Sequence, residues 1–273
     1  MDSEKDFLSN YKPGDYERPS VTADVAVFTV SDDDISDRRG YPENKLRLLL
    51  IKRGGHPFKD MWALPGGFFQ KGETIEECAV RELYEETKVM PVSVMPLGVF
   101  SAPDRDPRGW IISNAYVSII GDEAVKQVGS DDASDAQWFS VGFRCDGNGE
   151  YHLSLTHDDI ELKAVLSEKK SVFGRTEFSI VDSGDIAFDH AAMICTALSA
   201  LRTKAVEHDA ILDFLPERFT LAALRRVQEA VMSISALPAN LSRMASRYVE
   251  ETDEYVKGEE SCSAKLYKRK NNT

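Results

Sequence analysis

Three glutamates, Glu82, Glu85 and Glu86, are spaced so that one helix would carry all three on the same side. Residues at i, i+3 and i+4 are neighbours on a helix, and each like-charge pair costs an isolated helix about 0.2–0.5 kcal/mol. Negative charge is also disfavoured near a helix C-terminus by the helix dipole. A hard divalent cation such as Mg²⁺ removes this penalty, because it takes oxygen ligands and shares them with substrate phosphates. The spacing therefore favours a metal site for phosphate chemistry over a merely solvated acidic helix.

The residues before these glutamates predict the helix that carries them. Thr74 and Glu77 form a capping-box pattern, so the helix is expected over about 75–87. Ala79 and Leu83 recur on one face, which would pack against a sheet.

The segment from Gly67 to Val89 closely resembles the Nudix box, Gly-x5-Glu-x7-Arg-Glu-U-x-Glu-Glu-x-Gly-U, where U is aliphatic. It matches every defining position except the last glycine, where Lys88 stands. The resemblance implies an α+β protein with the α/β/α Nudix fold and a mixed sheet. It also implies hydrolysis, with Mg²⁺ or Mn²⁺, of a phosphoanhydride in a nucleoside diphosphate linked to another moiety. Lys88 would occupy a helix C-cap, where a cation at least suits the dipole.

The same resemblance implies roles for individual residues. Glu82 and Glu86 would be the main metal ligands, and Glu85 a further ligand or the base. The backbone carbonyl of Gly66 would also touch the metal. Arg81 would orient the glutamates by pairing with them. The catalytic residues that the resemblance implies are therefore Arg81, Glu82, Glu85 and Glu86.

A second polar segment, residues 103–109, carries side chains suited to a diphosphate. Guanidinium groups match phosphate oxygens, and carboxylates accept bonds from ribose hydroxyls. The candidate substrate-binding residues are Arg53, Asp104, Arg105 and Arg108. The alternative is that this Pro- and Gly-containing loop simply keeps its charges in water.

Short apolar runs predict the strands of the sheet. These runs lie at about 21–30, 46–51, 92–100, 113–120, 137–141, 160–166 and 177–181, and a helical pattern covers 188–204. Segments 32–44 and 121–135 are polar and are expected to be loops. The predicted domain spans 21–207, after an N-terminal arm of residues 1–20.

The remaining residues, 208–273, have the outline of a winged helix. Thr220 is the expected N-cap of a helix at 221–232, followed by a turn, a short helix at 239–247 and a hairpin whose last strand is 265–269. The candidate DNA contacts are Asn240, Ser242, Arg243, Arg247, Lys268 and Arg269. With this outline, nearly the whole chain resembles the Nudix-related transcriptional regulators of NAD metabolism. That resemblance implies ADP-ribose or a related ligand, operator DNA as a partner, and a homodimer.

The net charge of the chain weakens the prediction that it binds DNA. The 273-residue chain has 33 Lys and Arg against 46 Asp and Glu, a net charge of −13, which argues against non-specific nucleic-acid binding over the whole surface. Residues 210–273 hold ten cationic and nine acidic residues, a net charge of only +1. An alternative therefore stays open, in which this part packs against the Nudix core or a second subunit.

Other features predict a cytoplasmic protein without membrane contact. The N-terminus has neither a basic nor an apolar signal region, and no run of about 18 apolar residues occurs. Four scattered cysteines, at 78, 145, 195 and 262, are expected to be reduced and mostly structural thiols. Two function hypotheses follow: a Mg²⁺-dependent pyrophosphatase for ADP-ribose, or an ADP-ribose-responsive regulator with little or no hydrolysis.

Overall fold

The computed structural model describes residues 3–12, 14, 16–36, 42–91, 93–121, 136–170, 176–207, 210–233, 245–257 and 263–270. Its strands are β1 (Ser20–Ser36), β2 (Pro42–Lys52), β3 (Trp62–Ala63), β4 (Gly66–Phe68), β5 (Met95–Phe100), β6 (Ile111–Ile119), β7 (Ala136–Cys145), β8 (Glu150–His157), β9 (Ile160–Lys170), β10 (Thr176–Asp182), β11 (Val249–Lys257) and β12 (Ser263–Arg269). Its helices are α1 (Glu4–Asn10), α2 (Ile75–Thr87), α4 (His190–Glu207), α5 (Leu221–Met232) and the 3₁₀ helix η2 (Ala210–Phe214).

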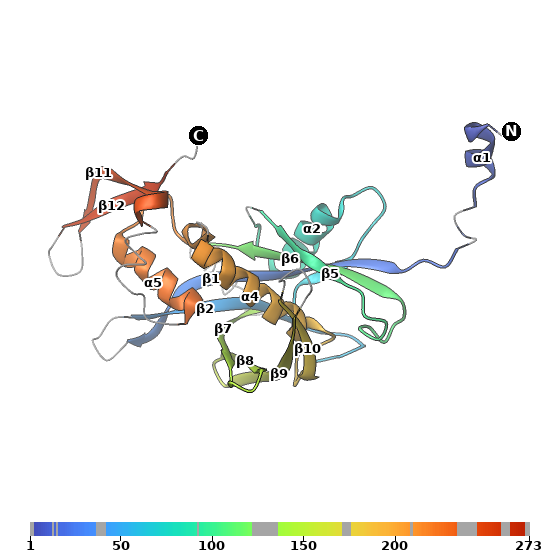
Figure 1. The fold of residues 1–273 in the computed structure, drawn as a ribbon, viewed down its shortest axis with the longest axis horizontal. Coiled ribbons are helices and arrows are strands. Elements are labelled where there is room, and N and C mark those ends of the chain that lie inside the picture. The colour runs from blue at the N-terminus through green and yellow to red at the C-terminus, as the bar shows by residue number, and fades with distance from the viewer. Residues whose placement is uncertain are drawn as a thin grey trace.

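Ten strands form one mixed sheet (Figure 1). Its main path runs β10-β9-β8-β7-β2-β1-β6-β5, while β3 pairs with β2 and β4 pairs with β1. Strands β1 and β6 run parallel, and the other pairs in this sheet are antiparallel. The predicted mixed sheet is therefore confirmed.

Alternate residues of β1 face two different apolar layers, as the pleat of a strand requires. Val25 and Val27 join the cluster that contains the buried face of α2. Ala26 and Phe28 join the larger cluster that contains the buried residues of α4. Helices thus cover both faces of the sheet, which confirms the predicted α/β/α layers.

Some predicted boundaries were wrong. Residues 32–36 and 42–44, expected to be loop, extend strands β1 and β2, where Ser31 pairs with Lys45 and Asp32 with Asn44. Once neighbouring residues are in register, the backbone ladder continues whatever the side-chain polarity, because strand propensity depends strongly on context. Strand β8 was missed, although Leu153 and Leu155 alternate with polar residues along it. Most of the expected loop at 121–135 lies outside the described residues.

The predicted C-terminal elements are present where the structure describes them. Helix α5 begins as expected, with the Thr220 side chain accepting a hydrogen bond from the Ala223 amide at 3.1 Å. Residues 245–248 are helical, β11 and β12 pair as an antiparallel hairpin, and the remainder of the predicted helix at 239–247 lies outside the described residues. This confirms helix α5 and the hairpin of the predicted winged helix, which follow the layered sheet.

Helix α4 connects this C-terminal unit to the sheet. Arg202 donates to the carbonyl oxygen of Val231 at 3.2 Å, to the hydroxyl of Ser233 at 2.9 Å and to the carbonyl oxygen of Phe143 at 3.2 Å. Buried residues of α5 also belong to the same apolar cluster as α4 and the sheet. The end of α5 is therefore held against both α4 and β7.

The N-terminal helix α1 projects away from the layers (Figure 1), and none of its residues is buried. No helix among the described residues is long and apolar enough to cross a membrane. Cys78, Cys145 and Cys195 are free thiols, as predicted, and Cys262 lies outside the described residues.

Candidate functional site

Helix α2 has the ends that the sequence predicts. The Thr74 hydroxyl accepts from the Glu77 amide at 3.2 Å, and the Glu77 carboxylate accepts from the Thr74 amide at 2.7 Å. The helix runs over Ile75–Thr87 and buries Ala79 and Leu83 against the sheet. The glutamates on its other side are thereby fixed relative to the loop that precedes it.

Lys88 occupies the C-cap of α2 in the left-handed conformation, with φ of 62°. This conformation costs a residue with a Cβ atom about 1–2 kcal/mol, whereas glycine adopts it without that penalty. We expect Lys88→Gly to stabilise the protein by about 0.5 kcal/mol, because glycine's greater freedom in the unfolded chain offsets part of the gain. Chemical denaturation measures the change. A destabilised variant would show that the hydrogen bond from Lys88 Nζ to the Glu85 carbonyl oxygen, at 3.1 Å, outweighs the backbone effect.

Arg81 ties the helix to the preceding loop. It donates to the Glu73 carboxylate at 2.8 and 2.9 Å, to Glu82 at 2.7 Å and to the carbonyl oxygen of Phe68 at 3.2 Å, and it reaches Glu85 at 3.5 Å. The hydrogen bonds from Arg81 lower the pKa of Glu73 to about 2. Glu73 also accepts the amide of Gln70 at 2.8 Å. Glu73 thus braces the loop, and Arg81 pairs with Glu82 and reaches Glu85.

Two glycines let this loop approach the helix and strand β1 closely. A Cβ atom at Gly67 would overlap the Glu82 carboxylate, and one at Gly66 would overlap Asp24 and the backbone of Ala23. The Gly66 amide donates to Glu86 at 2.9 Å. The Glu82 and Glu86 carboxylates therefore both lie against this loop, and carboxylate oxygens are ligands that a hard divalent cation prefers.

The pKa of Glu86 is raised to about 7. The main cause is loss of surrounding water, followed by the negative charges of Glu82 and Asp24, while the bond from the Gly66 amide opposes the shift. Part of the Glu86 side chain nevertheless keeps contact with solvent. Its neighbour Glu85 is more loosely held, with 58% of its side chain exposed.

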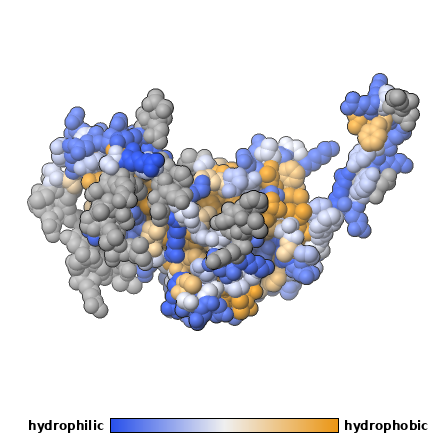
Figure 2. Space-filling view, in the orientation of Figure 1, coloured by the Kyte–Doolittle hydropathy of each residue, from blue (hydrophilic) through white to orange (hydrophobic). Residues whose placement is uncertain are grey.

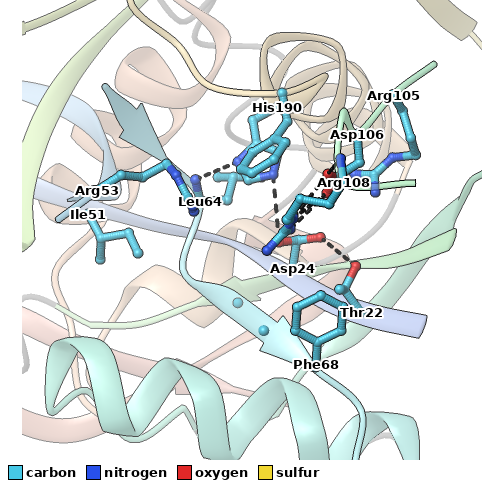
Figure 3. A pocket seen from close by; sticks show the side chains of 13 residues that line it. Thr22, Asp24, Ile51, Arg53, Leu64, Phe68, Arg105, Asp106, Arg108 and His190 are labelled. Carbon is cyan, nitrogen blue, oxygen red and sulfur yellow. Dashed lines mark hydrogen bonds and ion pairs between the residues drawn. The ribbon is translucent and has the colours of Figure 1, made fainter. Parts of the chain in front are cut away.

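A pocket opens beside this loop (Figure 3). Its lining comes from β1, the end of β2, β4, the segment before β6 and the start of α4, namely Thr22, Asp24, Ile51, Arg53, Leu64, Gly66, Gly67, Phe68, Arg105, Asp106, Arg108, Phe188 and His190. Cationic and aromatic side chains thus gather next to the helix glutamates.

Three of the four predicted substrate-binding residues line the pocket: Arg53, Arg105 and Arg108. Arg105 is almost fully buried and binds Asp189 through two hydrogen bonds, at 2.7 and 3.0 Å. Arg108 keeps 37% of its side chain exposed and pairs with Asp106. Asp104 is exposed and is not among the lining residues. The geometry makes Arg53 and Arg108 the accessible cations, while the Arg105 guanidinium is largely occupied.

The sequence reasoning missed a buried pair, Asp24 and His190. Asp24 accepts hydrogen bonds from the hydroxyls of Ser113 and Thr22, and burial raises its pKa. His190 Nδ1 accepts the Leu64 amide at 2.9 Å, so Nε2 carries the proton, and Nε2 lies 3.6 Å from Asp24 Oδ1. A carboxylate alone in an apolar, β-branched strand was the signal that could have revealed this site.

Burial lowers the pKa of His190 to about 4, from about 6.5 for a free histidine. Between these two pH values the unfolded state binds more protons at His190 than the folded state does. The free energy of unfolding is therefore unaffected by His190 above about pH 6.5 and decreases as the pH falls toward 4. The loss should reach about 3 kcal/mol, since each pKa unit corresponds to about 1.4 kcal/mol. We expect His190→Gln to be less sensitive to acid, as measured by urea unfolding between pH 7.5 and 4.5. Equal acid sensitivity in the two proteins would contradict this assignment.

The predicted DNA contacts are described only in part. Arg247 is exposed, with its guanidinium 5.1 Å from the centre of the Tyr248 ring. Lys268 pairs with Glu250 at 2.8 Å, and Arg269 pairs with Asp213 at 2.6 Å. Asn240, Ser242 and Arg243 lie outside the described residues. The surface over the hairpin β11–β12 is hydrophilic (Figure 2), yet the cations Lys268 and Arg269 already have acidic neighbours.

Comparisons with known proteins agree with this architecture. The fold is similar to the crystal structure of a MutT/nudix family protein from Enterococcus faecalis, with a TM-score of 0.73 and 31% identity, over 99% of this chain and 95% of the other. It is also similar to Shewanella oneidensis NrtR complexed with a 27mer DNA, with a TM-score of 0.63 and 25% identity, over 92% and 93% of the two chains.

Two curated relatives differ in how much of this chain they match. An ADP-ribose pyrophosphatase from Methanocaldococcus jannaschii is 48% identical over 103 residues, which are 37% of this chain and 59% of the relative. The ADPR responsive transcriptional repressor NtrR from Acinetobacter baylyi is 27% identical over 256 residues, 92% of this chain and 83% of the relative. The chain thus spans about three fifths of the pyrophosphatase.

The NUDIX domain model matches residues 36–143, which include α2 and its glutamates. The structural likeness to the Enterococcus faecalis protein extends far beyond that segment, over nearly the whole of both chains. This protein therefore belongs to the Nudix family.

Proposed function

We propose that the protein binds ADP-ribose, or a related nucleoside diphosphate linked to another moiety, and hydrolyses its phosphoanhydride with Mg²⁺. The observation that carries this proposal is the contact of Glu82 and Glu86 with the glycine loop, beside a pocket lined by Arg53 and Arg108. A match to an ADP-ribose pyrophosphatase, 48% identical over 103 residues, supports the same substrate class.

Each residue has a proposed role in this reaction. Glu82, Glu86 and the Gly66 carbonyl would hold the divalent ion, and Glu85 would be a further ligand or the base. Arg81 keeps Glu82 in place through the ion pair at 2.7 Å. A bound divalent ion supplies charge neutralisation at the diphosphate and lowers the pKa of coordinated water. Nudix hydrolases as a family use divalent metals, and the oxygen donors of this site fit Mg²⁺ or Mn²⁺.

Release of AMP from ADP-ribose by the purified protein, with and without Mg²⁺, tests this function. A calorimetric titration under non-hydrolysing conditions measures binding separately. We expect metal-dependent AMP release together with saturable binding. Absence of both would refute the proposal, whereas binding without release would remove the hydrolase and favour a sensor.

We propose as a second function that the protein is an ADP-ribose-responsive transcriptional regulator. The observation that favours it is the match to the ADPR responsive repressor, which covers 92% of this chain and therefore extends beyond the Nudix segment to include helix α5. In this proposal residues 1–20 are an arm, 21–207 the ligand-binding domain and 208–273 the DNA-binding domain, acting as a homodimer. The DNA contacts would be Asn240, Ser242, Arg243, Arg247, Lys268 and Arg269.

A mobility-shift titration on promoter DNA of nearby NAD genes, at several salt concentrations, tests the regulator. Phosphate contacts release counterions, so a specific complex should weaken steeply as salt rises. In this complex Lys268 and Arg269 would leave Glu250 and Asp213 and bind DNA phosphates. Lys268→Ala should therefore reduce the slope of log binding constant against log salt concentration by about one. Failure to find a specific, salt-sensitive complex, with or without ADP-ribose, would rule this function out.

A further inference from the structure

Phe188 contacts both accessible arginines of the pocket. The guanidinium carbon of Arg53 is 4.7 Å from the centre of the Phe188 ring, and that of Arg108 is 5.3 Å from it. Arg108 also lies 5.0 Å from the ring centre of Phe68. A guanidinium within about 6 Å of an aromatic face is attracted to the ring, more strongly where water is excluded. The Phe188 ring therefore attracts the guanidinium groups of both Arg53 and Arg108.

The two arginines would otherwise repel each other. Burial, and then the positive charge of Arg108, lower the pKa of Arg53, as expected for two neighbouring groups of like charge. Arg108 is steadied by Asp106 at 2.7 Å, and Arg53 by the carbonyl oxygen of Pro57 at 2.9 Å. Figure 3 shows Arg53 and Arg108 reaching toward the same space from different elements. Two like charges held together in a pocket favour a ligand with two negative charges.

The backbone at Phe188 is an independent indication of function. Its φ of 54° is in the left-handed region, which is costly for a bulky residue. Such conformations persist where the surroundings determine them, and they concentrate at binding sites. Here Ala187 donates to the carbonyl oxygen of Trp62 at 2.8 Å, and Asp189 is fixed by Arg105. The residues on both sides therefore hold the Phe188 ring toward the arginines.

We infer that Phe188 is a positioning residue that holds Arg53 and Arg108 side by side as a binding site for the two phosphates of a diphosphate ligand. Guanidinium groups bind phosphate oxygens through paired hydrogen bonds, and a preorganised pair loses less side-chain freedom on binding. The identity of the ligand as a nucleoside diphosphate rests on the proposed function. The positioning role itself rests on the contacts of Phe188.

Titration calorimetry with inorganic pyrophosphate and with ADP, both without metal, tests this role. Phe188→Leu and Phe188→Met remove the ring and keep an apolar side chain, and we expect each to weaken both ligands about tenfold, since two cation–π contacts are lost. Phe188→Tyr should restore binding to within about threefold, because it retains the ring. In hydrolysis of ADP-ribose, KM should rise while kcat stays unchanged.

Phe58→Leu is the matched control. The Phe58 and Phe188 rings pack edge to face, 4.7 Å between centroids, so loss of the Phe58 ring disturbs packing near Phe188 but leaves the Phe188 ring in contact with the arginines. We expect this variant to bind pyrophosphate as the wild type does. The inference is overturned if the wild type binds neither probe, or if the Leu and Met variants keep wild-type affinity. If the wild type binds pyrophosphate and these variants lose it while ADP-ribose is not hydrolysed, the proposed enzyme fails and the positioning role stands.

Discussion

Replacing Glu86 with Gln is expected to reduce Mg²⁺-dependent AMP release from ADP-ribose by at least about 100-fold. Loss of a group that merely supports a metal ligand costs about 10–100-fold in metal affinity or activity, so loss of a proposed ligand should cost more. The glutamine side chain is nearly the same size as that of glutamate. Its carbonyl oxygen can still accept the hydrogen bond that the Gly66 amide donates to Glu86 at 2.9 Å. The fold should therefore survive, and the defect should lie in the reaction.

Glu76→Gln provides the matched control for this prediction. Glu76 is exposed in the first turn of the same helix, so the variant removes the same charge without touching the loop. Steady-state assays should find it close to the wild type. Rates for Glu86→Gln within a few-fold of the wild type would remove Glu86 from the proposed metal site. Mn²⁺ titrations of both variants then measure metal affinity without relying on turnover.

Removing the Arg105 guanidinium is expected to destabilise the protein by about 3 kcal/mol or more. Breaking a buried ion pair by removing one partner typically costs about 3–5 kcal/mol, because the other charge stays buried without compensation. The Arg105 side chain is 3% exposed and that of Asp189 is 17% exposed. Arg105→Met keeps most of the volume, so its loss of stability in urea unfolding would report the unpaired Asp189 carboxylate.

Two further variants test the origin of this effect. Lys163→Met breaks the exposed pair with Glu161 at 2.9 Å, which should cost no more than about 1 kcal/mol. Combining Arg105→Met with Asp189→Leu removes both charges and should recover much of the lost stability. An Arg105→Met protein as stable as the wild type, with weaker ADP-ribose binding, would instead assign Arg105 to the ligand.

The elements that could be predicted are those defined by neighbouring residues. The capping box at Thr74 and the apolar face of α2 define this helix within one short segment, and both were confirmed. Thr220 likewise defines the start of α5. Strand β8 was predictable in principle from its alternating leucines, whereas the acidic end of β1 was not, since its pairing with β2 overrides its composition.

The pocket required contacts between distant parts of the chain. Asp24 meets His190, and Arg105 meets Asp189 across 84 residues, because the sheet order brings β1, the segment before β6 and the start of α4 together. The sequence treated Arg105 and Arg108 as equivalent candidates. Burial and the Asp189 carboxylate separate them, since one guanidinium is neutralised within the fold and the other remains accessible.

By itself, the sequence determined the glutamate helix, its glycine loop and hence the Nudix family of this protein, because that chemistry depends on spacing within one short segment. Which cations line the pocket, and the contact of two of them with Phe188, depend on how the chain folds. The physical reason is that charge pairing and desolvation depend on neighbours in space, and those neighbours come from strands and helices far apart in the chain.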